Sequence, residues 1–340
     1  LISADREFFE RFIKVVAVVA GIVAAIAVLQ WVETIFSASS SFLPPITGRI
    51  GSTIGNAAFL AGYLGMSFFI ILYALRDATG IWRRVFIASA VLSILAIFFA
   101  ATRGTMLALL CTGGVALIFT ALKGEENSKR NARYGLLALI VLAGFFFTFR
   151  TELAQSPFEP ISRIASISLS EGTVSSRLFV WQNIGAEALN NPLLGYGAEH
   201  IAQLFDKVYD PSKILEQWFD RSHNSFLDYF AQYGIFGLAL YLALIGAFIG
   251  YAIKLYKRDT RGGFLFLLLI VTYAVQNFFV FDTPSSLYLL YTLFALLIAS
   301  TSNIQQTQLV QRQLPIAVPW IVSVVIMLLI VPTIIFPLYA

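Results

Sequence analysis

The segment Ile13–Phe36 reads IKVVAVVAGIVAAIAVLQWVETIF and has no charged residue between Lys14 and Glu33. A helix of about 20 apolar residues is long enough to cross the hydrocarbon core of a bilayer. Other segments of this character lie near Ala57–Leu75, Val85–Ala101, Thr105–Leu122, Tyr134–Phe149, Asn224–Tyr256, Phe264–Phe281, Ser285–Ser300 and Ile316–Leu338. The sequence therefore predicts an all-α, polytopic transmembrane helix bundle with about nine spans.

The amino-acid composition supports a membrane protein. Hydrophobic residues make up 58% of the 340 residues and charged residues only 12%, about half the charged share of an average soluble domain. The net charge of +4 is spread over short loops, which argues against nucleic-acid binding. The single cysteine, Cys111, lies in an apolar run. It can form no intramolecular disulfide, and we expect it to pack inside the bundle.

One long segment interrupts the apolar pattern. Between Arg150 and His223 the sequence is polar and punctuated by Pro and Gly, and a connection of this length is usually functional. We expect transmembrane helices over residues 1–149, an extracytoplasmic catalytic loop over 150–223 and further transmembrane helices over 224–340. Because Leu1 stands where Met would open a chain and no signal pattern follows it, we also expect helices to precede it.

Lysine and arginine in the short connections predict the orientation, because cytoplasmic connections are enriched in both. Three connections on one side are basic, with Arg76, Arg83 and Arg84, then Lys123, Lys129, Arg130 and Arg133, and then Lys254, Lys257, Arg258 and Arg261. The short connections on the other side carry only Arg49, only Arg103 and no base near Asp282. The long loop therefore falls on the extracytoplasmic side.

This orientation makes a few arginines conspicuous. Arg49, Arg103, Arg177 and Arg221 lie on the side that should be poor in positive charge, and Arg103 stands in a tight turn between two spans. A guanidinium at such a depth is costly unless it is paired or used. Together these side chains could bind a diphosphate through planar, bidentate donors. Arg103 taken alone could equally be an interfacial, snorkelling residue.

Histidine is the second scarce residue type, with only His200 and His223. His223 stands where the polar loop gives way to a long apolar helix. The positive end of a helix dipole disfavours imidazolium, so a neutral imidazole that acts as a general base is plausible there. A structural, hydrogen-bonded role is the alternative for His223 and the expected role of His200.

Four short groups of residues resemble those of the O-antigen ligase and polymerase superfamily. They are Gly48–Asn56 (GRIGSTIGN); Thr102–Thr105 (TRGT); Ser176–Trp181 (SRLFVW) with Asn191–Gly197 (NPLLGYG); and Ser222–Phe226 (SHNSF) with Gly234–Gly237 (GIFG). Each is short, but their order and loop context make the combination specific. The resemblance covers most of the range Arg49–Leu242.

The resemblance implies a membrane glycosyltransferase of the GT-C type in the bacterial inner membrane, with its active site on the periplasmic face. Its donor would be a glycan on undecaprenyl diphosphate, and its acceptor a lipid, a glycan or a protein. By this resemblance the catalytic residues are Arg103, Arg177 and His223, and the substrate-binding residues include Arg49, Arg221 and Asn224. The family normally has further N-terminal spans that this chain lacks.

The chemistry of the residues agrees with this interpretation. Transfer from a diphosphate donor requires stabilisation of the departing diphosphate by a metal ion or by cationic side chains. The extracytoplasmic segments contain no Asp-x-Asp pair and no His pair at ligand spacing, so we expect arginines in place of a metal, and no cofactor. Trp181, Tyr196 and Trp218 could stack on sugar rings, although aromatic residues in such loops more often pack or anchor.

Other functions remain open from the sequence. A polymerase or a protein O-glycosyltransferase would differ from a ligase only in the acceptor. A small-solute or ion transporter would use intramembrane acids such as Glu33, Asp228 or Asp282, but the sequence has no inverted repeat of the kind common in transporters. A non-catalytic membrane anchor would leave the placement of the arginines and His223 unexplained.

Overall fold

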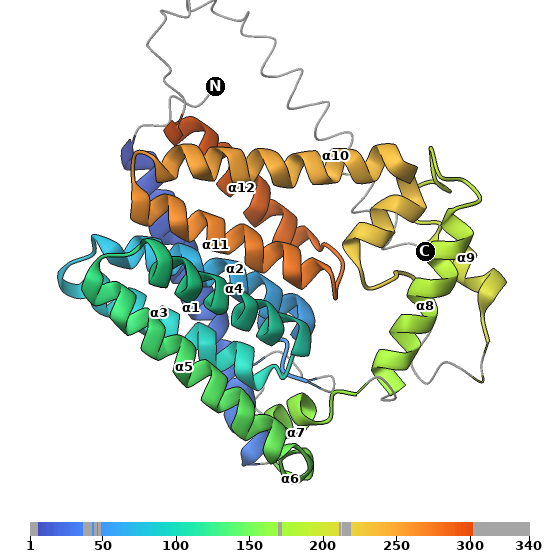
Figure 1. The fold of residues 1–340 in the computed structure, drawn as a ribbon, viewed down its shortest axis with the longest axis horizontal. Coiled ribbons are helices and arrows are strands. Elements are labelled where there is room, and N and C mark those ends of the chain that lie inside the picture. The colour runs from blue at the N-terminus through green and yellow to red at the C-terminus, as the bar shows by residue number, and fades with distance from the viewer. Residues whose placement is uncertain are drawn as a thin grey trace, which may run out of the picture. The chain divides into compact units, whose positions relative to one another are not determined.

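The computed structural model describes residues 6–36, 43, 46, 49–168, 172–210, 212 and 219–301, and within them it contains helices and no strand (Figure 1). Over these described ranges, seven helices are long and apolar enough to cross a membrane. They are α1 (Arg6–Ile35), α2 (Ala57–Arg76), α3 (Gly80–Phe99), α4 (Arg103–Lys123), α5 (Glu126–Thr148), α10 (Ser225–Tyr256) and α12 (Pro284–Thr301). The predicted all-α, polytopic fold is confirmed.

One further long helix, α11 (Thr260–Asn277), belongs to the same bundle. It is less apolar because Arg261 stands near its start and Gln276 near its end. It packs against α2, α4 and α10. The predicted spans up to Ser300 thus correspond to helices of the bundle, whereas the predicted span Ile316–Leu338 lies outside the described residues.

Two clusters of buried apolar side chains hold the bundle together. The first joins α1, α2, α10, α11 and α12 and includes Phe248, Leu269 and Leu293. The second joins α1, α2 and α3, and small residues such as Ala20 and Ala24 let α1 approach its neighbours closely. Large side chains thus fill both clusters, and the small residues of α1 add close helix contacts to the second.

Other helix faces expose apolar side chains, as a surface in contact with lipid requires. On α5 these include Leu137, Ile140 and Phe147, and Ala132 is the one buried residue among those described in that helix. Cys111 on α4 is exposed as well, so the expectation that it packs inside the bundle is wrong. The reason is that α4 turns a different face, with Thr112, toward α11.

The basic connections meet at one end of the bundle. Arg76 at the end of α2 forms an ion pair with Asp259, between α10 and α11. Phe119 near the end of α4 contacts the rings of Tyr256 and Phe264. The connections α2–α3, α4–α5 and α10–α11 therefore lie together. The opposite end, where α4 and α10 begin and α11 ends, is called the site end below.

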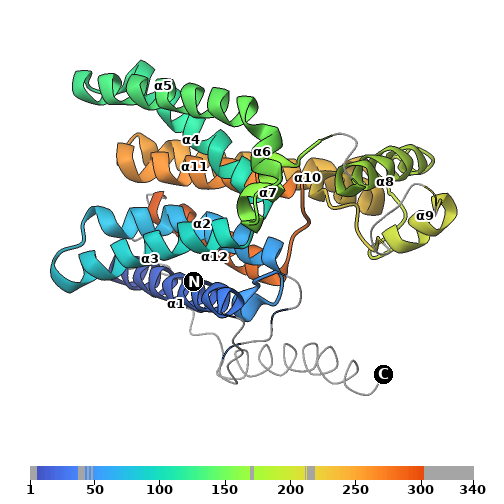
Figure 2. The ribbon, with the colours of Figure 1, turned by 90° about the horizontal axis from the view of Figure 1, so that it is seen from below.

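The segment between Arg150 and His223 is largely helical. It contains α6 (Arg150–Ala154), α7 (Glu159–Ala165), α8 (Gly172–Ala188) and α9 (Ile201–Val208). Helices α8 and α9 and the start of α10 share an apolar core of their own, which includes Ile184, Leu204 and Ala231. They lie beyond one end of the bundle in both views (Figure 1, Figure 2). We call α8, α9 and residues 225–233 the outer layer.

A glycine kink separates the outer-layer part of α10 from the rest of that helix. Gly234 has φ +64° and ψ −162°, a conformation open almost only to glycine. A Cβ atom there would lie 2.1 Å from the carbonyl oxygen of Leu193, and the N–H of Tyr196 donates to the carbonyl oxygen of Ala231 at 2.9 Å. Two glycine-containing motifs noted in the sequence thus pack against each other, and the predicted span that begins at Asn224 consists of two pieces.

Candidate functional site at one end of the bundle

Strained backbone is concentrated at the site end. Among the described residues, the non-glycine residues with positive φ are Ser52 (52°), Ala101 (49°), Glu199 (61°) and His223 (56°). Each lies within a few positions of a residue predicted to act in the site. Because left-handed backbone is unfavourable for residues with a Cβ atom and gathers at functional sites, these positions mark this end as the candidate site.

Arg49 closes the turn between α3 and α4. Its Nη1 donates to the carbonyl oxygens of Ala100 and Ala101, at 3.3 Å each, and to Thr102 Oγ1 at 3.4 Å. These carbonyl groups end α3, where a cation is favoured by the helix dipole. Arg49 therefore holds the turn from which Arg103 projects.

Three other arginines act on Arg49 at this end. Burial lowers the pKa of the Arg49 guanidinium, and the charges of Arg163, Arg177 and Arg103 lower it further, against the opposing charge of Glu159. Charges affect one another in this way only when they are close. The structure thus brings together Arg49, Arg103 and Arg177, and adds Arg163, which the sequence analysis did not single out. These four residues are called the arginine cluster.

Arg103, the first residue of α4, reaches toward α7. Its Nε donates to the carbonyl oxygen of Arg163 at 2.7 Å, and its Nη2 donates to Ser166 Oγ at 3.0 Å. Arg150 holds the same stretch, because its Nε donates to the carbonyl oxygen of Ala165 at 2.9 Å. The end of α7 therefore lies between two guanidinium groups.

Arg177 and His223 lie near each other. Arg177 Nη1 on α8 donates to the carbonyl oxygen of Phe279 at 3.1 Å, just after the end of α11. Burial lowers the pKa of the His223 imidazole to about 4, and the charge of Arg177 contributes in the same direction, against that of Asp220. His223 is therefore neutral at pH 7, in the protonation state that a general base requires.

The imidazole of His223 is positioned by its surroundings. Its ring centroid is 5.4 Å from those of both Phe219 and Phe281. The preceding residue, Ser222, donates its N–H to Asp228 Oδ1 at 2.9 Å and accepts a hydrogen bond from Trp181 Nε1 at 2.8 Å. None of the hydrogen bonds found within the described part of the chain involves a ring nitrogen of His223. The turn that carries His223 is thus fixed by hydrogen bonds. The ring nitrogens of His223 can bond to a substrate.

Arg221 has different surroundings from the arginine cluster. Its Nη2 donates to both carboxylate oxygens of Glu199 at 2.6 Å, and its Nη1 donates to Gln232 Oε1 at 3.2 Å. The guanidinium carbon lies 5.8 Å from the centre of the Phe281 ring, so Arg221 and His223 share this neighbour. The side chain of Glu199 is 74% exposed. An ion pair so open to water is weak and can exchange with an anionic substrate.

Three predicted substrate-binding residues also form bonds within the fold. Asn224 caps the start of α10 through its side-chain oxygen, and Trp181 holds the turn before His223. The hydroxyl of Tyr196 donates to the carbonyl oxygen of Glu187 at 3.2 Å, and its ring lies 5.1 Å from Lys207 Nζ. Tyr196 thus lies beside α8 and α9, and no contact found in the described ranges joins it to the arginine cluster.

Residues considered for other roles are bonded inside the fold. His200 Nδ1 lies 2.7 Å from the carbonyl oxygen of Ala198. Asp282 accepts hydrogen bonds from the Tyr273 hydroxyl at 2.9 Å and from Asn277 Nδ2 at 2.8 Å. Trp218 lies outside the described residues. Over the described ranges, no group of three or more His, Cys, Asp or Glu side chains could hold a metal ion.

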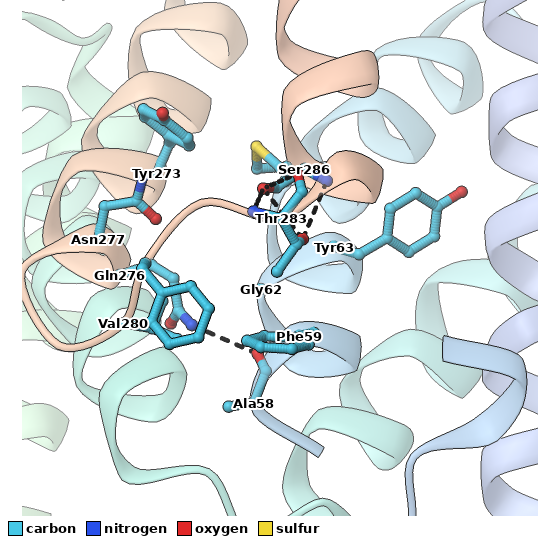
Figure 3. A pocket seen from close by; sticks show the side chains of 12 residues that line it. Ala58, Phe59, Gly62, Tyr63, Tyr273, Gln276, Asn277, Val280, Thr283 and Ser286 are labelled. Carbon is cyan, nitrogen blue, oxygen red and sulfur yellow. Dashed lines mark hydrogen bonds between the residues drawn. The ribbon is translucent and has the colours of Figure 1, made fainter. Parts of the chain in front are cut away.

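A small pocket adjoins the site between α2 and the α11–α12 connection (Figure 3). Its wall is mostly apolar and includes Phe59, Tyr63 and Phe281, together with the side-chain amides of Gln276 and Asn277. Since Phe281 also contacts His223, the pocket extends the site from the outer layer into the bundle.

These features define a class of protein, a polytopic helical membrane protein with an arginine cluster and a neutral histidine at one end of its bundle. Residues 88–242 match the protein family described as O-antigen ligase, and the match includes Arg103, Arg163, Arg177 and His223. This match supports a relationship of residues 88–242 to the O-antigen ligase superfamily. No curated relative matches the chain.

Proposed function

We propose that the protein is an O-antigen ligase-like enzyme that transfers a glycan from undecaprenyl diphosphate to an acceptor hydroxyl. The observation that carries this proposal is the arginine cluster beside neutral His223. All of these residues except Arg49 lie in the part of the chain that matches the family. Guanidinium groups suit the charge and geometry of a diphosphate. A neutral imidazole suits the removal of a hydroxyl proton.

The proposed reaction is a direct displacement. The acceptor oxygen forms a bond to the anomeric carbon while the bond from that carbon to the diphosphate oxygen breaks, and the configuration inverts. His223 takes the proton of the hydroxyl. Undecaprenyl diphosphate leaves with the bonding electron pair, and Arg103 and Arg177 stabilise the charge that develops on it. In this mechanism the arginines take the role that a metal ion has in other glycosyltransferases.

We further propose that the site end faces the periplasm and that the protein lies in the bacterial inner membrane. The basic connections at the opposite end, where Arg76 pairs with Asp259, support this orientation because such loops remain in the cytoplasm. In this arrangement residues 150–223 form the catalytic region between two groups of membrane helices. Arg49, Arg221, Asn224, Trp181 and Tyr196 would border the diphosphate and the glycan.

The experiment that tests the proposal is transfer by the purified protein in lipid nanodiscs. An undecaprenyl-diphosphate-linked glycan is supplied with a lipid A core, a growing polysaccharide or a peptide rich in Ser and Thr. We expect glycan transfer to one acceptor, release of undecaprenyl diphosphate, and no loss of rate with EDTA. The preferred acceptor decides between ligase, polymerase and protein O-glycosyltransferase.

Two results would contradict the proposal. A folded protein that released no undecaprenyl diphosphate with any of these acceptors would not be such a glycosyltransferase. A rate abolished by EDTA and restored by Mg²⁺ or Mn²⁺ would replace the arginine mechanism with a metal-dependent one.

A further inference from the structure

Helix α7 is held in place on both sides. Before it, the ring of Phe158 packs against those of Trp31 and Phe99, with centroids 6.0 and 6.5 Å apart. At its end, Arg103 Nε donates to the carbonyl oxygen of Arg163. A helix of seven residues is not stable by itself, so these contacts determine where α7 lies. Its side chains are therefore presented at the site end in a fixed position.

Arg163 is the α7 side chain that belongs to the arginine cluster. Among the charges that act on Arg49, that of Arg163 has the largest effect. The ion pair that Arg163 makes within the described residues is with Glu159, at a long 3.9 Å, and that carboxylate is 56% exposed. Its Nε is buried without a hydrogen-bond partner among them. A buried donor of a charged group is unfavourable without a partner, and an acceptor oxygen of an anion would supply one.

We propose that Arg163 binds the diphosphate of the donor from the α7 side, as an additional cationic partner beside Arg103 and Arg177. This inference rests on the proposed function and extends its diphosphate site by one residue. A bound diphosphate offers several acceptor oxygens, one of which would accept from Nε of Arg163. Its negative charge would also offset the repulsion among the guanidinium groups.

The side chain of Arg163 can be changed without removing the anchor of α7, because Arg103 bonds to its carbonyl oxygen. Arg163→Gln removes the charge, and Arg163→Lys keeps the charge but loses the planar donors. Glu159→Gln removes the neighbouring negative charge. Lys207→Gln is the matched control, because it removes a positive charge from α9, where Lys207 pairs with Glu187.

The probe is inorganic diphosphate, titrated calorimetrically into the full chain in nanodiscs at constant ionic strength. We expect Arg163→Gln to raise the Kd about tenfold, the effect of losing one charge-assisted hydrogen bond. Arg163→Lys should recover part of the affinity, and Glu159→Gln should bind more tightly than the parent. Lys207→Gln should bind as the parent does.

The binding measurements distinguish a diphosphate site that lacks Arg163 from a protein that has no diphosphate site. If Arg177→Gln weakened binding while Arg163→Gln bound like the parent, Arg163 would have no part in a site that still exists. If Glu159→Gln weakened binding as much as Arg163→Gln, the loss would come from a distorted α7, and the inference would also be wrong. A parent protein that did not bind diphosphate would instead overturn the proposed function.

Discussion

The Nη1 atom of Arg177 lies 3.1 Å from the carbonyl oxygen of Phe279, although 102 positions separate the two residues in the chain. This bond ties the outer layer to the end of α11. This bond holds the guanidinium of Arg177 beside His223. Burial lowers the pKa of the His223 imidazole, and the charge of Arg177 lowers it further. A cation held in place stabilises a developing negative charge better than a mobile one, since it need not reorganise during the reaction.

Arg177→Ala should therefore slow glycan transfer on the order of 10²–10³-fold, the usual effect of losing a donor to a developing charge. Arg177→Lys should recover only part of the rate, because an ammonium group lacks the planar geometry. The measurement is the initial rate of undecaprenyl diphosphate release. Lys207→Ala is the charge control and should react at the parent rate. An Arg177→Ala rate equal to that of the parent would remove Arg177 from the mechanism.

The two histidines provide a matched comparison. His223→Ala should lower kcat on the order of 10²–10⁴-fold, the range for loss of a positioned general acid or base. His200→Ala should have little effect, because the His200 side chain is exposed and, among the described residues, it bonds only to the nearby carbonyl oxygen of Ala198. Both variants must first be shown to insert and accumulate normally. Equal rates for the two variants would contradict the assignment of the base.

The lowered pKa of His223 predicts a pH dependence. Its value of about 4, against an ordinary 6.5, means that the folded protein binds this proton less readily than the unfolded chain. The stability contributed by neutral His223 is complete above pH 6.5 and is lost as the pH falls toward 4. We expect kcat/KM to fall on the acid side with a midpoint near pH 4. A midpoint near 6.5 that is absent in His223→Gln would show that the imidazole titrates normally.

The kink in α10 can be tested with two glycines of the same helix. Gly234→Ala should destabilise the fold by about 1–3 kcal/mol from backbone strain alone, and further through the contact with Leu193. Gly246→Ala is the control, since its added methyl meets nothing within 4 Å. Thermal unfolding in detergent measures both. If the two variants unfolded at the same temperature, α10 would not need the kink.

The proposed orientation predicts which positions a membrane-impermeant thiol reagent can label. Asn190, after α8, and Ser128, at the start of α5, are both exposed in the structure. Single cysteines at these positions, in a Cys111→Ala background, should differ in intact spheroplasts: position 190 should react, and position 128 only after lysis. The reverse pattern would place the site end in the cytoplasm.

The sequence predicted which segments form the helices of the bundle, but it did not predict where a helix is kinked. An apolar run of about 20 residues has few alternatives to a helix in a bilayer, so α2 and α12 were expected close to their actual bounds. The kink at Gly234 was not expected. In sequence Gly234 resembles Gly246 and Gly250, and only its contact with Leu193 requires the unusual backbone.

The sequence predicted only part of the site, because contacts between distant segments decide which residues meet there. Scarcity of charge on one side pointed to Arg103 and Arg177, and the structure brings both into one cluster. Arg163 lies in the same segment as Arg177, between Arg150 and His223, but it was not predicted, because α7 is too short for its helical pattern to be recognised. The bonds of Trp181 and Asn224 within the fold depend on the turn around Ser222, which no local pattern predicts.

The outer layer has its own apolar core, formed by side chains such as Val180, Phe205 and Phe230. A region with a separate core is a cooperative unit that can open while the remainder stays folded. Bonds such as those from Arg177 to Phe279 and from Ser225 to Val280 fasten it to the bundle. We therefore expect the outer layer to be able to open locally while the membrane helices stay folded.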